Sequence, residues 1–184
     1  ESETAVARDA VLDVFDKFPD QVTPGRSKLW IIRTIDLGPR AGEGIGVYPP
    51  AEGETYPCLV SAVDHDGNEL AGIRLPDLTR PVASHAGWNV RDPDTGSPDQ
   101  QIPMLGFTKW FPATESEREA AGDPRLSLEE RYPDRAHYAA LVQRDAEALV
   151  RDGFVLELDF DLVVQNAVDR YDVATARIPE TRSV

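Results

Sequence analysis

The sequence predicts a mixed α/β fold, with a few short strands, a loop-rich middle and a helical C-terminal third. Three apolar runs with β-branched residues, the pattern of strands, lie within the first 75 of the 184 residues. The fifteen prolines and thirteen glycines cluster between residues 38 and 103, which favours loops there. Residues 114–172 carry helix-capping patterns followed by apolar side chains at helical spacing. We therefore expect strands first, then an irregular segment, then helices.

The N-terminal part is expected to form one helix and one strand. Apolar side chains recur every three or four positions through residues 4–18, which predicts an amphipathic helix. Pro19 and the Pro24-Gly25 pair end this helix, because proline lacks the N–H that a helix interior needs. The run from Leu29 to Ile35 predicts a strand. The Gly/Pro stretch that follows, from Gly38 to Pro57, shows no convincing periodicity.

A β-hairpin is predicted between residues 58 and 75. The segments Cys58 to Val63 and Leu70 to Leu75 are both strand-like. Between them, Asp64 to Glu69 contains an Asp-Gly pair, and glycine supplies the positive φ that a tight turn needs. A calcium loop is the alternative, since acidic and amide side chains alternate there. The glycine comes too early for such a loop, and Leu75 stands where a bidentate glutamate should close it, so the hairpin is the better interpretation.

Residues 76–113 form a long segment that six prolines interrupt, and we expect it to be irregular. Connections of this length without their own secondary structure are uncommon in compact domains, and they tend to be functional or to cover another surface. That surface need not belong to this chain.

The last third is predicted to be helical. Two capping boxes, Thr114 to Glu117 and Ser127 to Glu130, place a hydroxyl and a carboxylate where a helix begins. Asp134 begins a longer helix that Gly153 ends. Its apolar face comprises Tyr138, Leu141, Val142, Ala146, Leu149 and Val150. A final helix near residues 159–171 has an apolar face of Leu162, Val163, Ala167, Val168 and Tyr171.

The charge of the chain bears on its partners. The formal net charge is −14, from 33 acidic and 19 basic residues, so binding to nucleic acid or to an anionic membrane surface is disfavoured. No apolar run is long enough to span a membrane. Cys58 is the only cysteine, which excludes an internal disulfide, and its apolar neighbours indicate a buried thiol.

The machinery of a serine hydrolase is incomplete in this sequence. Such an enzyme needs a nucleophilic serine, a histidine that takes its proton and a carboxylate that orients the histidine. In α/β-hydrolases the serine lies in Gly-x-Ser-x-Gly, because only small residues tolerate the strained turn. Ser27 has Gly25 two positions before it but Leu29 two positions after it, and no other serine has both glycines. The chain by itself therefore lacks a nucleophile of this kind.

The three histidines differ in what they can do. His65 at the turn is expected to be exposed, and His137 in a capped helix is expected to be partly exposed. His85 follows a short apolar run among small residues, where a strand end could present an imidazole to a cleft. The more common outcome at such a position is a histidine hydrogen-bonded to nearby backbone. No two histidines have the spacing of metal ligands, and Gly42 to Gly46 lacks the flanking strand and helix of a phosphate cradle, so we expect neither a metal nor a cofactor.

Several blocks of the sequence carry a resemblance to a known family. The run from Val63 to Asp77, the triplet Gly87-Trp88-Asn89, the run from Gly122 to Tyr132 and the triplet Arg170-Tyr171-Asp172 resemble the C-terminal region of a bacterial family of α/β-hydrolase domain proteins. The similarity covers most of the chain, in order, from about residue 6 onward. This sequence departs from the family's pattern twice: His85-Ala86 stands where an aromatic-threonine pair is expected, and Tyr171 replaces a tryptophan.

The resemblance implies that this chain is one C-terminal segment of a larger hydrolase. Members of the family are longer, and their nucleophilic serine and catalytic histidine precede the region seen here, so no triad residue carries over. The implied organisation is helix plus strands in 1–75, an irregular segment in 76–113, a helical region in 114–172 and a tail in 173–184. The implied function is part of a serine-type hydrolase that acts on an ester or related acyl bond of a small molecule. Its partner would be the N-terminal part with the nucleophile, as a separate chain or lost.

Two other interpretations stay open. The chain could be a non-catalytic binding module, with Trp88, Trp110 and Phe111 as an aromatic contact surface. Alternatively, His85 with Asp77 or Asp64 completes a catalytic set across the chain boundary, since acid before histidine is the order that α/β-hydrolases use after the serine. In that case Trp88 and Asn89, close to His85 in the sequence, are the candidate substrate-binding residues.

Overall fold

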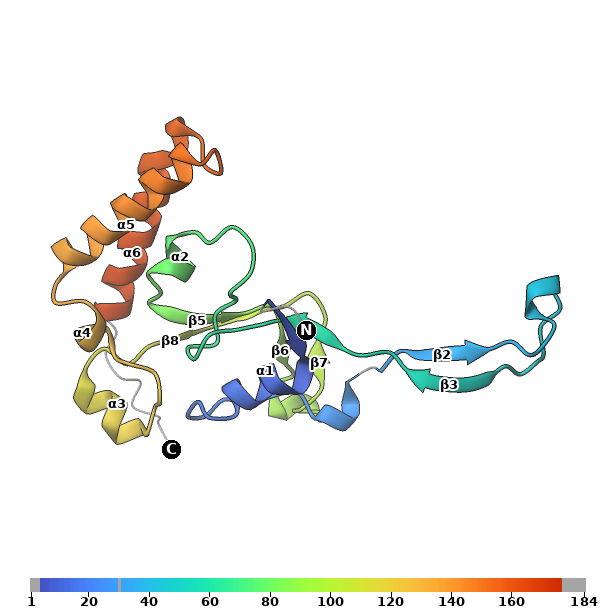
Figure 1. The fold of residues 1–184 in the computed structure, drawn as a ribbon. Helices are drawn as coiled ribbons and strands as arrows, with labels where there is room; N and C mark the ends of the chain where they lie inside the picture. Colours follow the sequence, from blue (N-terminus) through green and yellow to red (C-terminus); the bar gives the residue numbers. More distant parts are fainter. Residues whose placement is uncertain (1–3, 30, 177–184) are drawn as a thin grey trace.

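Six α-helices and four two-stranded antiparallel sheets form the part of the chain that the structure, a computed structural model, describes: residues 4–29 and 31–176. Helices α5 and α6 run side by side and stand over the β5–β8 sheet, while the β2–β3 hairpin projects from the other side of the body (Figure 1). The mixed α/β prediction is confirmed. The strands are β1 (Ala5–Ala7), β2 (Arg33–Asp36), β3 (Ala51–Thr55), β4 (Leu59–Ser61), β5 (Ala83–Ala86), β6 (Asn89–Val90), β7 (Gln101–Ile102) and β8 (Phe107–Trp110). The helices are α1 (Arg8–Phe15), α2 (Pro76–Thr79), α3 (Glu115–Ala121), α4 (Leu128–Arg131), α5 (Arg135–Arg151) and α6 (Phe160–Ala176).

The N-terminal helix is shorter than predicted. It spans Arg8–Phe15, because the residues before it form β1 and pair with β4, Ala5 opposite Ser61 and Ala7 opposite Leu59. The apolar face of the helix is buried as expected, with Phe15 only 1% exposed. Burying one such aromatic side chain contributes roughly 1.5–3 kcal/mol to stability.

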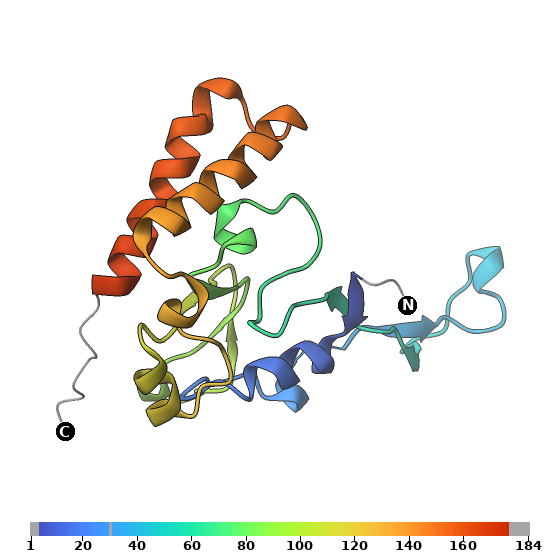
Figure 2. The same cartoon turned by 60° about the vertical axis from the view of Figure 1, so that its left-hand side comes forward.

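The β2–β3 hairpin projects as an arm from the body (Figures 1 and 2). The predicted strand from Leu29 to Ile35 begins only at Arg33, and residue 30 lies outside the described residues. The strand β3 was not predicted. Its residues show no apolar alternation because this sheet has no buried face: four of the five residues of β3 are exposed. A period-2 pattern arises only where one face of a sheet is covered.

The turn after β4 has the predicted conformation, but the second strand of the hairpin does not form. Oδ1 of Asp64 accepts hydrogen bonds from the backbone N–H groups of Asp66 and Asn68, each at 3.0 Å, and Gly67 has a φ of +82°. Only the Val63–Glu69 bridge follows, so the prediction of a strand from Leu70 to Leu75 is wrong. Gly72, with a φ of +82°, turns the chain away from β4.

Gly67 is expected to be the most sensitive glycine of this region. A Cβ there would lie 2.8 Å from the Phe15 ring, in addition to the backbone strain of positive φ. We expect Gly67→Ala to lower the free energy of unfolding by about 2–3 kcal/mol in urea titrations followed by circular dichroism. The control is Gly122→Ala, where φ is also positive but nothing lies within 4 Å of the added carbon, and we expect a loss of about 1 kcal/mol. If the two variants lost the same free energy of unfolding, the contact between the added methyl group and the Phe15 ring would not be destabilising.

The prediction that residues 76–113 are irregular is wrong. The segment contains α2 and two antiparallel pairs, β5 with β8 and β6 with β7. His85 stands opposite Thr108 in the first pair, and Asn89 stands opposite Ile102 in the second. These strands have only two to four residues, too few to produce a recognisable apolar period.

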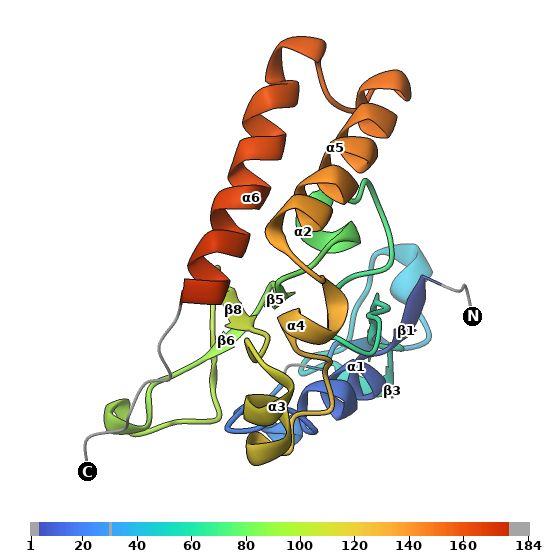
Figure 3. The same ribbon diagram turned by 90° about the vertical axis from the view of Figure 1, so that its left-hand side faces the viewer.

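The helices of the last third are confirmed. The Thr114 side chain caps α3, Ser127 and Glu130 form a complete capping box at α4, and Asp134 caps α5. Figure 3 shows α5 and α6 as an antiparallel pair. Tyr138 of α5 stacks on Tyr171 of α6, with ring centroids 4.5 Å apart. The buried core of this region comprises Val82, Phe111, Leu128, Tyr132, Tyr138, Val142, Ala167, Val168, Tyr171 and Ala174.

Two details of the predicted apolar positions are wrong. Leu162, placed on the buried face of the last helix, is 60% exposed; it lies in the first turn of α6, ahead of the buried residues Ala167 and Val168. Cys58 is half-buried rather than buried, since it lies at the edge strand β4. The tail predicted for 173–184 begins inside α6, and residues 177–184 lie outside the described part. Among the described residues, no helix is both long and apolar enough to cross a membrane.

Candidate active site

His85 is the predicted site residue whose position the structure defines most closely. It lies on β5, and Nδ1 of its imidazole is 3.1 Å from Oγ1 of Thr108, directly across the ladder on β8. The other edge of β5 is held by a side chain. Oδ1 of the fully buried Asn68 accepts a hydrogen bond from the His85 backbone N–H at 2.9 Å, and its Nδ2 donates to the Ala83 carbonyl at 3.0 Å. Asn68 therefore replaces a neighbouring strand and fixes the backbone that carries the imidazole.

The Nε2 atom of His85 is buried and has no hydrogen-bond partner among the described residues. Buried polar atoms in native proteins almost always have a partner, so this atom calls for an explanation. Burial lowers the pKa of His85 below its ordinary value of 6.5; the nearby Asp77 carboxylate opposes this shift, and the Arg170 guanidinium adds to it. The imidazole is therefore neutral at pH 7, the state that can accept a proton.

Asp77 is the acidic residue that the structure brings to His85. A hollow of about 380 Å³ is lined by Asp77, His85, Thr108 and Arg170, together with apolar side chains. The Asp77 carboxylate forms an ion pair with Arg170 of α6, which stands 93 positions later in the sequence. The consecutive elements α2 and β5, together with the distant α6, thus place a carboxylate, an imidazole and a guanidinium around one hollow.

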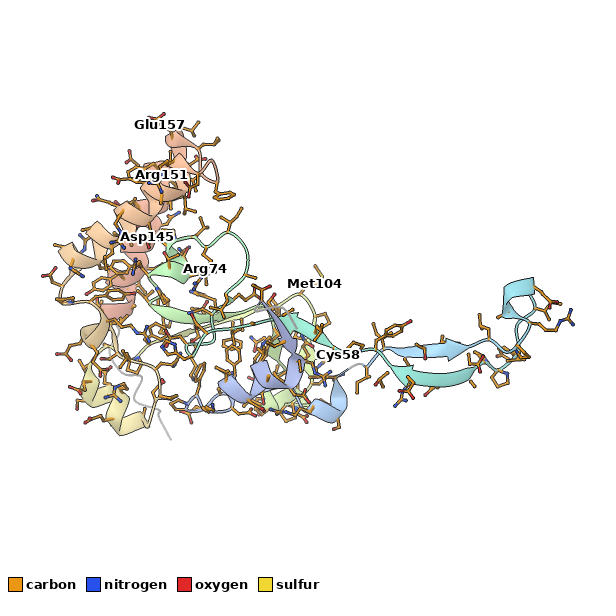
Figure 4. The ribbon with its side chains drawn as sticks, viewed as in Figure 1. Cys58, Arg74, Met104, Asp145, Arg151 and Glu157 are labelled. Carbon is orange, nitrogen blue, oxygen red and sulfur yellow. The ribbon has the colours of Figure 1, made fainter. Side chains whose placement is uncertain are left out.

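The position of α2, and with it Asp77, is fixed by Asp145 of α5. The Asp145 carboxylate accepts hydrogen bonds from Oγ1 of Thr79 and from Nε of Arg80, both at 2.8 Å. Figure 4 shows Asp145 where α5 lies over α2. The ion pair is partly buried, and hydrogen bonds by Arg80 and Thr79 hold the pKa of Asp145 below its ordinary value against the opposing effect of burial.

Asp64, the alternative partner of His85, is engaged elsewhere. Its Oδ1 caps the turn through two backbone N–H groups, and its Oδ2 lies 3.6 Å from Arg74. It does not line the hollow with His85. The structure therefore brings Asp77, and not Asp64, to the histidine.

Trp88 and Asn89 have different surroundings. The Trp88 ring packs edge-on against Phe15 and Phe107, with centroids 5.1 and 4.9 Å apart. Trp88 and His85 both line a second cavity of about 230 Å³. Asn89 lines neither of these spaces: its Oδ1 accepts a hydrogen bond from the Val90 N–H, and its Nδ2 donates to the Gly106 carbonyl at 3.4 Å.

Ser84 precedes the histidine in sequence but is unsuited to be a nucleophile. It is fully buried, its hydroxyl donates to the Asp66 carbonyl, and Nη1 of Arg125 donates to it at 2.8 Å. Arg125 in turn pairs with Asp123 at 2.6 Å, and Arg131 pairs with the Asp66 carboxylate at the same distance. In the sequence, the Gly122 to Tyr132 run stood out only through the family resemblance. Nothing in its pattern predicted that one of its arginines would be buried.

The remaining candidates lie away from the hollow. His65 is exposed, as predicted, and so is His137. Phe111 is 3% exposed and belongs to the helical core, and Trp110 packs against that core. With Trp88 in a second aromatic cluster, the three side chains form no common contact surface, which argues against the binding-module interpretation.

The lowered pKa of His85 predicts how stability depends on pH. Above pH 6.5 the imidazole is neutral in the folded and unfolded chains, so it makes no difference to stability. Below pH 6.5 the His85 imidazole is protonated more readily in the unfolded chain than in the folded chain. The folded state therefore becomes less stable as the pH decreases. We expect the His85 imidazole to titrate below 6.5 by proton NMR, and His85→Gln to reduce the loss of stability between pH 6.5 and 5. A titration midpoint above 6.5 would contradict this assignment.

Comparison with known protein families identifies one match. The model of a family described as alpha/beta hydrolase domain matches residues 19–165. Comparisons with curated proteins and with solved structures found no match. The matched range includes Asp77, His85 and the buried network around Ser84, and it ends before Arg170.

Proposed function

The chain belongs to the alpha/beta hydrolase domain family, and on that premise we propose that it is one part of a serine-type hydrolase acting on an ester or related acyl bond. The observation that carries the proposal is the neutral His85, whose buried Nε2 has no partner within the described residues. A histidine that acts as a general base must be neutral at the working pH and must face the proton that it takes. His85 meets the first condition, and its unused nitrogen is available for a hydroxyl that these residues do not supply.

The nucleophile of the proposed enzyme lies outside the 184 residues. The sequence contains no Gly-x-Ser-x-Gly, and Ser84 is held inside the buried network. The resemblance supports the same placement of the serine, N-terminal to this region of a bacterial hydrolase. It also implies a catalytic histidine there, so the choice of His85 as the base rests on its buried Nε2, without a partner among the described residues, and not on the resemblance. We therefore assign this chain as a C-terminal segment of such an enzyme and assign the nucleophile to an N-terminal part.

Within the proposed enzyme, Asp77 is the residue that stabilises the charge of His85 during proton transfer. Its carboxylate lies close enough to oppose the lowering of the His85 pKa. A carboxylate near the imidazole stabilises the imidazolium that forms when the serine loses its proton. Arg170 holds the Asp77 carboxylate in place through the ion pair.

The surface of the chain supports the presence of another part. The side chains of the β2–β3 arm lie away from the body (Figure 4). An isolated two-stranded hairpin is at best marginally stable in water. Large apolar side chains on and beside this arm are exposed, as they would be where a further part of the enzyme packs: Ile31, Ile32, Ile35, Leu37, Ile45, Val47, Tyr48 and Tyr56.

Recovery of the intact enzyme tests the proposal. The chain, carrying an affinity tag, is isolated from the cells that produce it, and the accompanying polypeptides are sequenced and assayed with p-nitrophenyl acetate. We expect a polypeptide with Gly-x-Ser-x-Gly and ester turnover in the same fraction, and no turnover by the 184-residue chain alone. A folded, monomeric chain with neither a companion nor turnover would contradict the proposal, and so would turnover by the chain alone.

A further inference from the structure

A half-enclosed cavity of about 230 Å³ is lined in part by His85, which also lines the Asp77 hollow. Its walls come mainly from α1, β4, the turn at Gly67 and the end of β5, with further contributions from Pro24, Leu29 and Gln101. A cavity of roughly 150 Å³ lined by apolar side chains can hold one benzene molecule. This cavity therefore has room for one aromatic ring with a short substituent.

The walls of the cavity are mostly apolar. Val11, Leu12 and Phe15 of α1 form one side, and Val60 of β4 and Trp88 form another. The Phe15 and Trp88 rings contact each other edge-on, with their planes at 82°, and both line the cavity. Aromatic rings favour such edge-to-face contacts, which suits a further ring bound beside this pair.

The cavity is formed in advance of any ligand. Phe15 also packs against Phe18 and Phe107, with centroids 5.3 and 5.7 Å apart, so its ring is fixed from three sides. Gly67 lets the turn lie directly on that ring. Binding sites for small molecules are usually such preformed apolar spaces with a few polar groups at the margin. Here His85, Arg8 and Glu69 are among the polar residues that line it.

We propose that this cavity binds a small uncharged aromatic group of the substrate, a phenyl ring with up to three further non-hydrogen atoms. At roughly 30 Å³ for each water-sized group, the volume corresponds to about eight non-hydrogen atoms, so a long alkyl chain does not fit. Since His85 lines both spaces, a ring bound here places its substituent beside the imidazole. The role of this group as the acyl portion of an ester rests on the proposed function; the binding of the ring does not.

The test uses acetophenone, a ketone that no esterase can hydrolyse, on the full 184-residue chain. Binding is followed by the NMR signal of the Trp88 indole N–H, assigned with Trp88→Phe, and 2-undecanone serves as the linear comparison. We expect saturable binding of acetophenone and at least tenfold weaker binding of 2-undecanone. No saturable shift, or equal affinity for the two ketones, would overturn the proposal.

Two neighbouring residues of β4 give matched variants. Val60 lines the cavity, whereas Leu59 does not and is 52% exposed. We expect Val60→Phe to weaken acetophenone binding at least tenfold, because the added ring fills the cavity, and Leu59→Phe and Val60→Ala to retain it. Near-ultraviolet circular dichroism checks that each variant keeps the aromatic cluster. Unchanged binding by a folded Val60→Phe would overturn the proposal.

The same variants separate this inference from the proposed function. In the enzyme with its nucleophilic part, Val60→Phe should raise KM for methyl benzoate at least tenfold, whereas Leu59→Phe, outside the cavity, should leave it unchanged. If acetophenone binds but no ester is turned over, the cavity assignment stands and the proposed function fails. If esters are turned over while Val60→Phe changes neither acetophenone binding nor the KM for methyl benzoate, the cavity assignment fails and the proposed function stands.

Discussion

Replacing His85 by glutamine is expected to lower kcat of the complete hydrolase for ester substrates by about 10²- to 10⁴-fold, the usual contribution of a general base. Glutamine retains a side chain that can bond to Thr108, which lies 3.1 Å from the imidazole, so the β5–β8 pairing should persist. It cannot take up a proton. KM should change little, because the imidazole acts in the transition state rather than in holding the substrate.

The chain provides two matched controls for this prediction. His65 and His137 are the only other histidines, and both are exposed and away from the hollow. We expect His65→Gln and His137→Gln to keep the kcat of the unchanged protein. If His85→Gln also leaves kcat unchanged, and its NMR spectrum shows that the structure around Asp77 is intact, then His85 is not the base and the proposed site is wrong.

Replacing Arg125 by methionine is expected to cause the largest loss of stability, about 3–5 kcal/mol, the range for removing one partner of a buried ion pair. The Arg125 side chain is 1% exposed and the Asp123 side chain 3% exposed. Arg125 donates hydrogen bonds to the Asp123 carboxylate and the Ser84 hydroxyl, and to the Lys109 carbonyl at 3.0 Å. Methionine fills much of the same volume but leaves a buried carboxylate without a counter-charge. Urea titrations followed by circular dichroism measure the difference.

An exposed ion pair gives the control for Arg125. Arg135 pairs with Asp172 at 2.7 Å, with side chains 57% and 43% exposed. Exposed pairs contribute little, so Arg135→Met should cost less than about 1 kcal/mol. Similar losses for Arg125→Met and Arg135→Met would show that the buried network does not hold β5 in place.

The helices of the last third could be predicted because their signals are local. Helices α3, α4 and α5 each begin at a side chain that accepts a hydrogen bond from the backbone N–H three positions later, as Ser127 does from Glu130. A pattern within four residues determines such a start, so the sequence alone reveals it. The strands between residues 83 and 110 depend on partners about twenty positions away, as with His85 and Thr108. No local pattern reports that pairing.

The candidate site could be predicted only in part for the same reason. The small residues around His85 and the order of acid and histidine pointed to His85 with either Asp77 or Asp64. Choosing between the two acids required knowing that the Asp64 carboxylate is used by its own turn. The roles of Asn68 and Arg170 were not visible either, since Asn68 acts on a strand 15 to 17 positions away and Arg170 on a helix 93 positions away. A residue whose partner is distant in the sequence can be assigned a role only from the structure.

The measurement that tests the central claim most directly is the position of a covalent label. The complete hydrolase is treated with a serine-directed fluorophosphonate, and the intact mass of every polypeptide is then determined. Because the 184 residues contain no Gly-x-Ser-x-Gly and Ser84 is buried, we expect one label on the companion polypeptide and none on this chain. Label on this chain would contradict the assignment of the nucleophile to another part, and an active enzyme without any label would contradict a serine-type mechanism.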